Sequence, residues 1–152
     1  MVACLTAAKA AGMPALVRVA DNDAGLVGRA LDAGAQGVVC PLIKSAEDAE
    51  HFVCAVKYPP RGHRSWGPYR AQLNVPGDYV SKANGWTIAC PQIETRGALD
   101  QLEEILAIEG VDMVCLGPND LSAALTGCFD VRASEVMEAA TLVLRKCREA
   151  SG

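Results

Sequence analysis

Short apolar runs alternate along this chain with segments in which apolar residues recur at helical spacing. The apolar runs cover residues 15–19, 37–42, 86–90 and 111–116. A helical pattern follows each of them. Strands that alternate regularly with helices are typical of an α/β protein with a parallel sheet. The pattern therefore predicts four β-strand–α-helix units.

The predicted helices begin and end at residues suited to those positions. The turn at residues 21–23 can cap a helix over residues 24–33, and Gly34 can end that helix. Ser45 begins another helix, which ends before Pro59. The remaining predicted helices cover residues 2–11, 78–84, 97–108, 121–125 and 134–150.

The length of the chain limits which barrel it can form. A closed eight-stranded barrel needs about 250 residues. This chain has 152 residues, and its pattern begins and ends with a helix. We therefore predict a partial TIM (β/α)8 barrel of about four central units, forming a single domain over residues 1–152.

The amino-acid composition argues against some classes of function. Hydrophobic residues make up 51% of the chain, charged residues 21% and aromatic residues 5%, with a net charge of −4. Without a basic patch, binding to nucleic acid is not expected. No apolar run approaches the roughly 20 residues of a membrane span, and the N-terminus does not resemble a signal peptide. We expect a cytoplasmic protein that binds neither nucleic acid nor membrane.

The cysteines predict reduced thiols. There are seven, an odd number, and no pair has C-x-x-C spacing. Cys40, Cys90 and Cys115 fall inside predicted strands, where cysteine behaves as a small core residue. Cys128 lies in a loop and is expected to be the most exposed.

Two carboxylates follow successive predicted strands. Glu94 lies in the segment P-Q-I-E-T (91–95) and Asp120 in G-P-N-D-L-S (117–122). Carboxyl ends of parallel strands meet at one pole, where active sites are built, so both should face one pocket. Either acid alone also fits a helix cap or turn. Two neighbouring carboxylates repel, and a divalent cation with oxygen ligands compensates that repulsion.

Other residues are expected to line this pocket. Gln92 precedes Glu94 by two positions and should share its face of the strand. The Gly117-Pro118 turn should leave backbone N–H groups exposed beside Asp120. Arg18 and Lys44 also lie at strand ends, but the sequence does not distinguish a structural from a functional role for them.

The segment 59–78 differs from the rest of the chain. It is rich in proline, glycine, arginine and aromatic residues, and a loop of this length is usually functional or disordered. Arg64 is flanked by glycines and an aromatic residue, and its planar guanidinium suits a carboxylate or enolate. We predict that Arg64 points into the same pocket, whereas Arg61 and Arg70 contribute less.

Five motifs, in order, resemble the HpcH/HpaI aldolase/citrate lyase family, and within it the class II pyruvate aldolases. The match extends over almost the whole chain. The motifs are V-R-V-A-D-N-D (17–23), A-L-D-A-G-A-Q-G-V-V-C-P (30–41), Y-P-P-R-G-H-R-S-W-G-P (58–68), P-Q-I-E-T (91–95) and G-V-D-M-V-C-L-G-P-N-D-L-S (110–122).

The resemblance implies a metal-dependent barrel enzyme that cleaves 2-oxo acids through a pyruvate enolate. It implies that Glu94 and Asp120 bind Mg²⁺, Mn²⁺ or Co²⁺ and that Arg64 stabilises the enolate oxygen. Gln92 would line the site. Backbone amides near Gly117 to Asp120, in the segment that also contains Pro118 and Asn119, would hold the substrate carboxylate.

The chain departs from the family in one respect. The family carries a D-x-E-H-type motif, with the expected general base, at the end of its second strand, and no such motif occurs here. We therefore expect a copy truncated at both ends, covering family strands 3 to 6, whose open sheet edges favour a homo-oligomer. Two interpretations stay open: a carbon–carbon lyase, by retro-aldol cleavage or decarboxylation, and a catalytically impaired scaffold or interaction protein.

Overall fold

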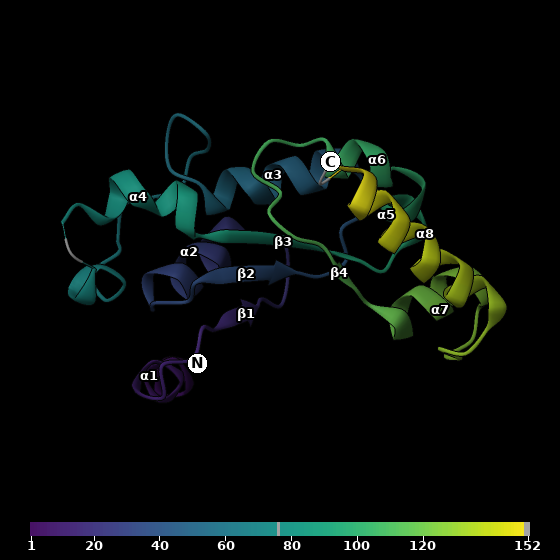
Figure 1. Cartoon of the computed structure of the whole chain (residues 1–152), viewed down its shortest axis with the longest axis horizontal. Helices are drawn as coiled ribbons and strands as arrows, with labels where there is room; N and C mark the ends of the chain where they lie inside the picture. Colours follow the sequence, from purple (N-terminus) through teal and green to yellow (C-terminus); the bar gives the residue numbers. More distant parts are fainter. Residues whose placement is uncertain (76, 151–152) are drawn as a thin grey trace.

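The computed structural model describes residues 1–75 and 77–150, and its centre is a sheet of four parallel strands (Figure 1). The strands follow one another in the sheet in the order β1-β2-β3-β4 and curl into a half barrel, which confirms the predicted fold class. Val17 pairs with Val38, Val38 with Ala89, and Gln92 with Cys115. The strands are β1 (Leu16–Arg18), β2 (Gly37–Cys40), β3 (Ile88–Ile93) and β4 (Cys115–Leu116).

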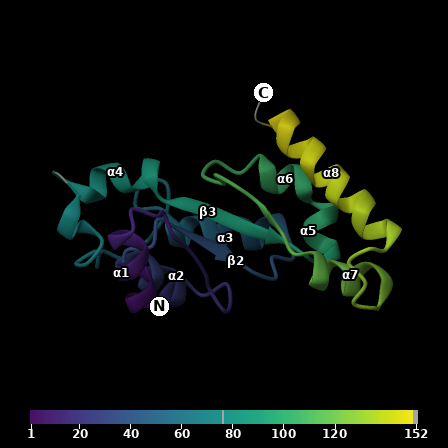
Figure 2. The ribbon, with the colours of Figure 1, turned by 60° about the horizontal axis from the view of Figure 1, so that its bottom comes forward.

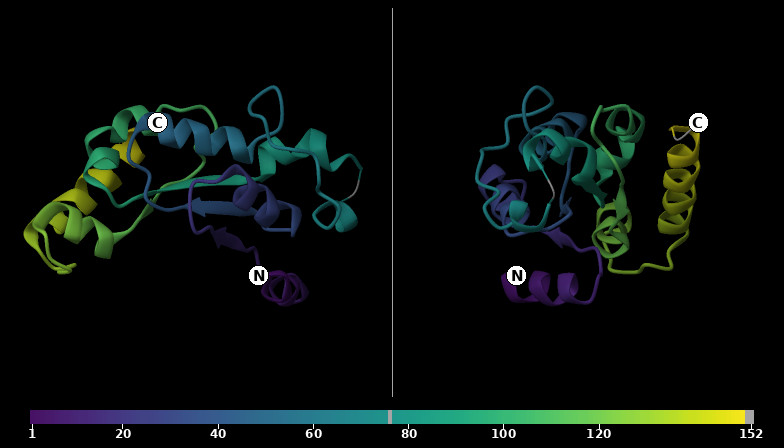
Figure 3. Two further views of the ribbon diagram at one scale, coloured as in Figure 1. Left: turned by 180° about the vertical axis from the view of Figure 1, so that it is seen from behind. Right: turned by 60° about the vertical axis from the view of Figure 1, so that its left-hand side comes forward.

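The helices lie around this sheet much as the sequence predicts. Helices α2 and α3 pack against each other and against β2 and β3, while α8 packs on α6 and α7 beyond β4 (Figure 2). The N-terminal helix α1 lies on the β1 side, away from α8 (Figure 3). The helices are α1 (Val2–Ala10), α2 (Ala24–Asp32), α3 (Ala46–Val56), the 3-10 helix η1 (Gln72–Asn74), α4 (Tyr79–Trp86), α5 (Arg96–Asp100), α6 (Leu102–Leu106), α7 (Pro118–Thr126) and α8 (Ser134–Ala150).

Local capping explains where several helices start. Asp23 accepts a hydrogen bond from the Leu26 backbone N–H at the start of α2, and Ser45 accepts one from the Asp48 N–H at the start of α3. These caps satisfy backbone donors that have no partner within the helix. Both helices begin on the carboxyl side of the strand before them, as the turn sequences predict.

The main core lies between the sheet and its helices. Val38 and Ile93 project from the strands, and Leu31 and Phe52 face them from α2 and α3, all with 0% exposure. Burial of a large apolar side chain contributes roughly 1.5–3 kcal/mol relative to exposure. Since residues alternate along a strand, the other face carries Arg18, Val39 and Gln92.

Two of the differences from the sequence prediction have a visible cause. Strand β4 has only two residues because Asp112 replaces part of the ladder: its carboxylate accepts the Ala89 N–H at 2.9 Å, and its N–H donates to the Ala89 carbonyl. The helix predicted over 97–108 is interrupted at Gln101, whose side-chain oxygen accepts the Ala46 N–H at 2.9 Å.

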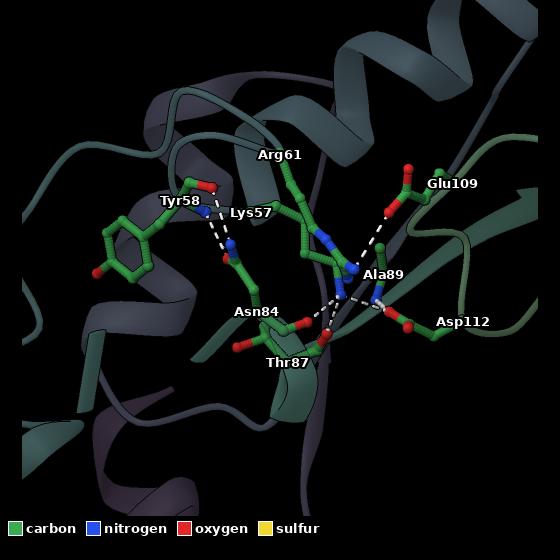
Figure 4. Close-up of polar contacts among 8 residues, drawn as sticks. All are labelled: Lys57, Tyr58, Arg61, Asn84, Thr87, Ala89, Glu109 and Asp112. Atoms are coloured by element: carbon green, nitrogen blue, oxygen red, sulfur yellow. Dashed lines mark hydrogen bonds and ion pairs between the residues drawn. The ribbon is translucent and has the colours of Figure 1, made fainter. Parts of the chain in front are cut away.

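A buried lysine joins elements at the amino ends of the strands (Figure 4). Lys57 is 1% exposed, and its Nζ donates to the carbonyls of Thr87 at 2.6 Å and Asn84 at 3.2 Å and to Asp112 Oδ2 at 2.8 Å. All three ammonium donors are thus used. This network fixes the end of α3 against the approaches to β3 and β4.

The seven cysteines are all free thiols, and Cys40, Cys90 and Cys115 lie in strands, as predicted. Cys128 is exposed, and so is Cys4. Among the described helices, none combines the length and the apolar character needed to cross a membrane.

Candidate functional site

A buried carboxylate lies just beyond the carboxyl end of β3. Glu94 is 1% exposed. Its Oε1 accepts the Leu42 backbone N–H at 2.7 Å, and its Oε2 accepts the Gln92 side-chain Nε2 at 2.5 Å. Both partners are neutral donors, so these bonds orient the carboxylate without neutralising its charge.

Arg18 extends this chain of polar groups to the first strand. Its Nε donates to Gln92 Oε1 at 3.1 Å, so Gln92 links a guanidinium on β1 to the Glu94 carboxylate on β3. The sequence left the role of Arg18 undecided. Its position at the end of a strand whose other residues are apolar was the signal that could have identified it.

The start of α7 completes the site from the fourth strand. Gly117 precedes the helix, and its N–H donates to the Ile93 carbonyl at 3.1 Å. A β-carbon at Gly117 would lie 2.1 Å from Glu94 Oε2 and 2.5 Å from Gln92 Nε2, so only glycine fits here. Asp120 lies in the first turn of α7, where it is exposed.

Helix α7 begins without a side-chain cap. Pro118 is the first helical residue, and Gly117 offers no side chain. The N–H groups of Asn119 and Asp120 therefore have neither a cap nor a partner within the helix. Together with the positive end of the helix dipole, they suit an anionic group bound beside Glu94.

The donor set fits a hard divalent cation held partly by other ligands. Glu94 and Asp120 offer carboxylate oxygens, and the structure brings the helix that carries Asp120 against Glu94. Among residues 1–75 and 77–150, no group of three or more His, Cys, Asp and Glu residues is arranged for a metal ion. Mg²⁺ is commonly bound by one or two carboxylates, with water and substrate supplying the rest.

The thiols near the site are not suited to nucleophilic chemistry. Burial, with smaller contributions from the charges of Asp21 and Asp48, raises the pKa of Cys40 to about 12. Burial likewise raises the pKa of Cys90 to about 12. Both therefore stay protonated at neutral pH, and the thiolate is the reactive form.

The structure does not bring Arg64 to this site. Arg64 is 4% exposed, and its Nη2 lies 2.8 Å from Oδ1 of Asp32, the last residue of α2. The backbone N–H of Arg64 donates to the Lys57 carbonyl, and the Arg64 guanidinium lies 4.5 Å from the centre of the Tyr58 ring. Lys57 in turn contacts the residue before β3, at the end of the sheet opposite Glu94.

The prediction that Arg64 shares a pocket with Glu94 is thus corrected, and the connectivity supplies the reason. The segment 59–78 follows helix α3 and precedes β3. A helix-to-strand connection in a parallel sheet lies at the amino ends of the strands, whereas Glu94 and Asp120 follow strands. Arg64 is a buried structural cation at that pole. Lys44, also left undecided by the sequence, is exposed beside the start of α3.

One family model matches the whole chain. The HpcH/HpaI aldolase/citrate lyase model covers residues 1–152. The crystal structure of a protein of this family from Burkholderia cenocepacia J2315 is similar, with a TM-score of 0.88 at 34% identity. That similarity covers 98% of this chain and 61% of the crystallised one.

Curated relatives are similar over most of this chain. It is 38% identical over 139 residues to a hydroxypyruvate/pyruvate aldolase from Roseovarius nubinhibens, covering 89% of the chain and 54% of that protein. It is 37% identical over 139 residues to a 4-hydroxy-2-oxo-heptane-1,7-dioate aldolase from Shigella sonnei, covering 89% and 53%. The chain thus spans about half the length of these relatives.

Proposed function

Because the chain belongs to the HpcH/HpaI aldolase/citrate lyase family, we propose that it serves metal-dependent cleavage of a carbon–carbon bond in 2-oxo acids. The reaction is retro-aldol cleavage or decarboxylation, and both leave a pyruvate enolate. The observation that carries this proposal is the buried Glu94 carboxylate, oriented by two neutral donors beside the uncapped start of α7.

Glu94 and Asp120 are the proposed ligands of a divalent cation of the Mg²⁺ type. When bound, such an ion supplies Lewis acidity that stabilises negative charge on a carbonyl oxygen. Glu94 contributes a carboxylate whose geometry is fixed before any ligand arrives, because Leu42 and Gln92 bind both oxygens. Asp120 adds a second, exposed carboxylate that can adjust to the ion.

The start of α7 is the proposed site for the substrate carboxylate. The N–H groups of Asn119 and Asp120 can donate to it, while the absence of a side chain at Gly117 lets the start of α7 lie directly against Glu94. The same arrangement binds anions at many helix N-termini. It would orient the 2-oxo group of the substrate toward Glu94.

Arg18 is the proposed residue that stabilises the enolate oxygen, a role that the family resemblance assigned to Arg64. Its guanidinium lies at the carboxyl end of β1 and is held by Gln92 at 3.1 Å. A cation placed where the enolate oxygen develops charge stabilises the transition state more than the ground state. Only one donor of Arg18 is used by Gln92, so the others are available to a ligand.

Oxaloacetate decarboxylation gives the most direct test, because cleavage of its carbon–carbon bond requires no proton removal from a hydroxyl group. We expect turnover by the 152-residue chain that depends on Mg²⁺ or Mn²⁺. Glu94→Gln and Asp120→Asn should each lower kcat/KM roughly 100-fold, as loss of a key charge-stabilising group does. Glu109→Gln is the matched control, because Glu109 lies at the other pole with its side chain 79% exposed. Metal-independent turnover, or equal loss in all three variants, would contradict the proposal.

A further inference from the structure

Leu42 adopts an unusual backbone conformation immediately after β2. Its φ is 53°, and within the described ranges 1–75 and 77–150 no other non-glycine residue has a positive φ. The left-handed region crowds the β-carbon of L-residues against the following carbonyl, so leucine rarely adopts it. Such a conformation persists only where the surrounding structure enforces it, and it is frequent at functional sites.

Contacts with the segment after β3 enforce this conformation. The Ile43 carbonyl accepts the Thr95 hydroxyl at 2.6 Å, and the Ile43 side chain has 0% exposure. The residue after Ile43, Lys44, is also held closely: a β-carbon at Gly97 would lie 2.2 Å from the Lys44 carbonyl oxygen. Residues 42–44 are therefore fixed along residues 94–97.

Burial of the leucine side chain does not explain the conformation. Leu42 is 49% exposed, so this conformation buries little of its apolar surface. The contact that the conformation does provide is polar: the Leu42 N–H donates to Glu94 Oε1 at 2.7 Å. No other described hydrogen bond reaches that oxygen.

We propose that Leu42 is a positioning residue whose left-handed conformation aims its N–H at Glu94 and so orients the carboxylate toward the metal. This inference rests on the proposed function, since it assigns Leu42 a role at the same site. Donors that orient a metal-binding side chain typically change metal affinity about 10–100-fold when they are lost.

The side chain at position 42 should matter through the backbone conformation that it permits. Asparagine tolerates the left-handed region, so Leu42→Asn should keep the N–H in place. Valine is branched at the β-carbon and strongly disfavours that region, so Leu42→Val should shift the N–H away from Glu94.

Mn²⁺ binding to the 152-residue chain tests the proposal without relying on turnover. We expect Leu42→Asn to bind like the unmodified chain and Leu42→Val to bind roughly 10-fold more weakly. Leu144→Val, at an exposed position of α8, is the matched control and should bind normally. Circular dichroism checks that each variant is folded. Equal affinity of the Val and Asn variants would overturn the proposal.

Amide exchange at Leu42 tests the same contact without metal. Glu94→Ala should accelerate exchange of the Leu42 N–H, whereas Glu104→Ala, at an exposed position of α6, should not. Unchanged protection in both variants would overturn the role of Leu42. A chain that binds no Mn²⁺ would refute the proposed function, and the exchange measurement would then decide separately whether Leu42 orients Glu94.

Discussion

The backbone of Gly117 packs directly against the carboxylate of Glu94. A β-carbon at Gly117 would lie 2.1 Å from Oε2 and 2.7 Å from the Glu94 β-carbon, distances that atoms in contact do not reach. The start of α7 can therefore approach the end of β3 only because residue 117 has no side chain. This approach brings the first turn of α7, with Asp120, to the site.

Gly117→Ala should displace Glu94 and weaken metal binding. The added methyl group forces either the carboxylate or the start of α7 to move, and we expect affinity for Mn²⁺ to fall about 10–100-fold. Gly28→Ala is the matched control, because a β-carbon at Gly28 in α2 meets no atom within 4 Å. That variant should be about 0.5–1 kcal/mol more stable, as alanine is favoured over glycine inside helices. Normal Mn²⁺ affinity in Gly117→Ala would contradict this account.

Arg18 and Arg64 should differ in what their loss affects. Arg18→Met should weaken oxaloacetate binding by about 1.5–3 kcal/mol if the guanidinium makes a charge-assisted bond to the ligand. Arg64→Met should instead lower the free energy of unfolding by roughly 2–4 kcal/mol, because it leaves Asp32 without its buried partner. Urea unfolding and substrate titration measure the two effects. A larger binding defect in Arg64→Met than in Arg18→Met would show that Arg64, and not Arg18, contacts the ligand.

Lys57→Met should destabilise the fold without altering the site. Methionine fills a similar volume but makes none of the three hydrogen bonds to Asn84, Thr87 and Asp112. We expect the free energy of unfolding to fall by roughly 2–4 kcal/mol, because the Thr87 and Asn84 carbonyls lose their donor while the Asp112 carboxylate, 39% exposed, keeps access to water. Lys146→Met is the control, since its ion pairs with Glu103 of α6 and Glu149 of α8 lie at the surface, where exposed ion pairs contribute little. Equal stability of the two variants would show that the Lys57 network contributes little.

The buried thiols should make the protein less stable in alkali. The pKa of Cys40 and that of Cys90 are about 12 in the folded protein, raised from 9.0 by burial. Unfolding releases thiols that lose their protons above pH 9, so the folded state binds more protons in this range. The stability is thus fully present below pH 9 and is lost as pH rises from 9 toward 12. Thermal unfolding at pH 8 and pH 10 measures this loss, which should be smaller in Cys90→Ala. An identical loss in that variant would exclude a contribution from Cys90.

The predicted elements agree with the structure where local chemistry decides them. Asp23 and Ser45 cap helices as their sequence contexts predict, and the apolar run 37–42 contains β2. Predictions failed where a distant side chain competes with the local pattern. The Asp112 carboxylate accepts the hydrogen bond of the Ala89 backbone N–H and so shortens β4. These residues are 23 positions apart, and no local sequence pattern predicts that they pair.

Part of the site follows from sequence because residues after successive parallel strands share one pole. That rule places Glu94 and Asp120 at the carboxyl ends of β3 and β4, and strand alternation gives Gln92 the same side as Glu94. The same rule, applied to a segment after a helix, assigns Arg64 to the opposite pole. The glycines and aromatic residues around Arg64 indicated an ordered arginine, but not where it lies.

The sequence by itself determined the order of strands and helices, because periodicity, capping residues and glycine stops act over a few residues. It also determined which carboxylates follow strands. Only the tertiary structure decided which groups meet: Arg18 with Gln92, Leu42 with Glu94, and Arg64 with Asp32, pairs separated by 74, 52 and 32 positions. These contacts depend on how the strands and helices are placed next to one another in space, and no local pattern along the chain encodes that placement.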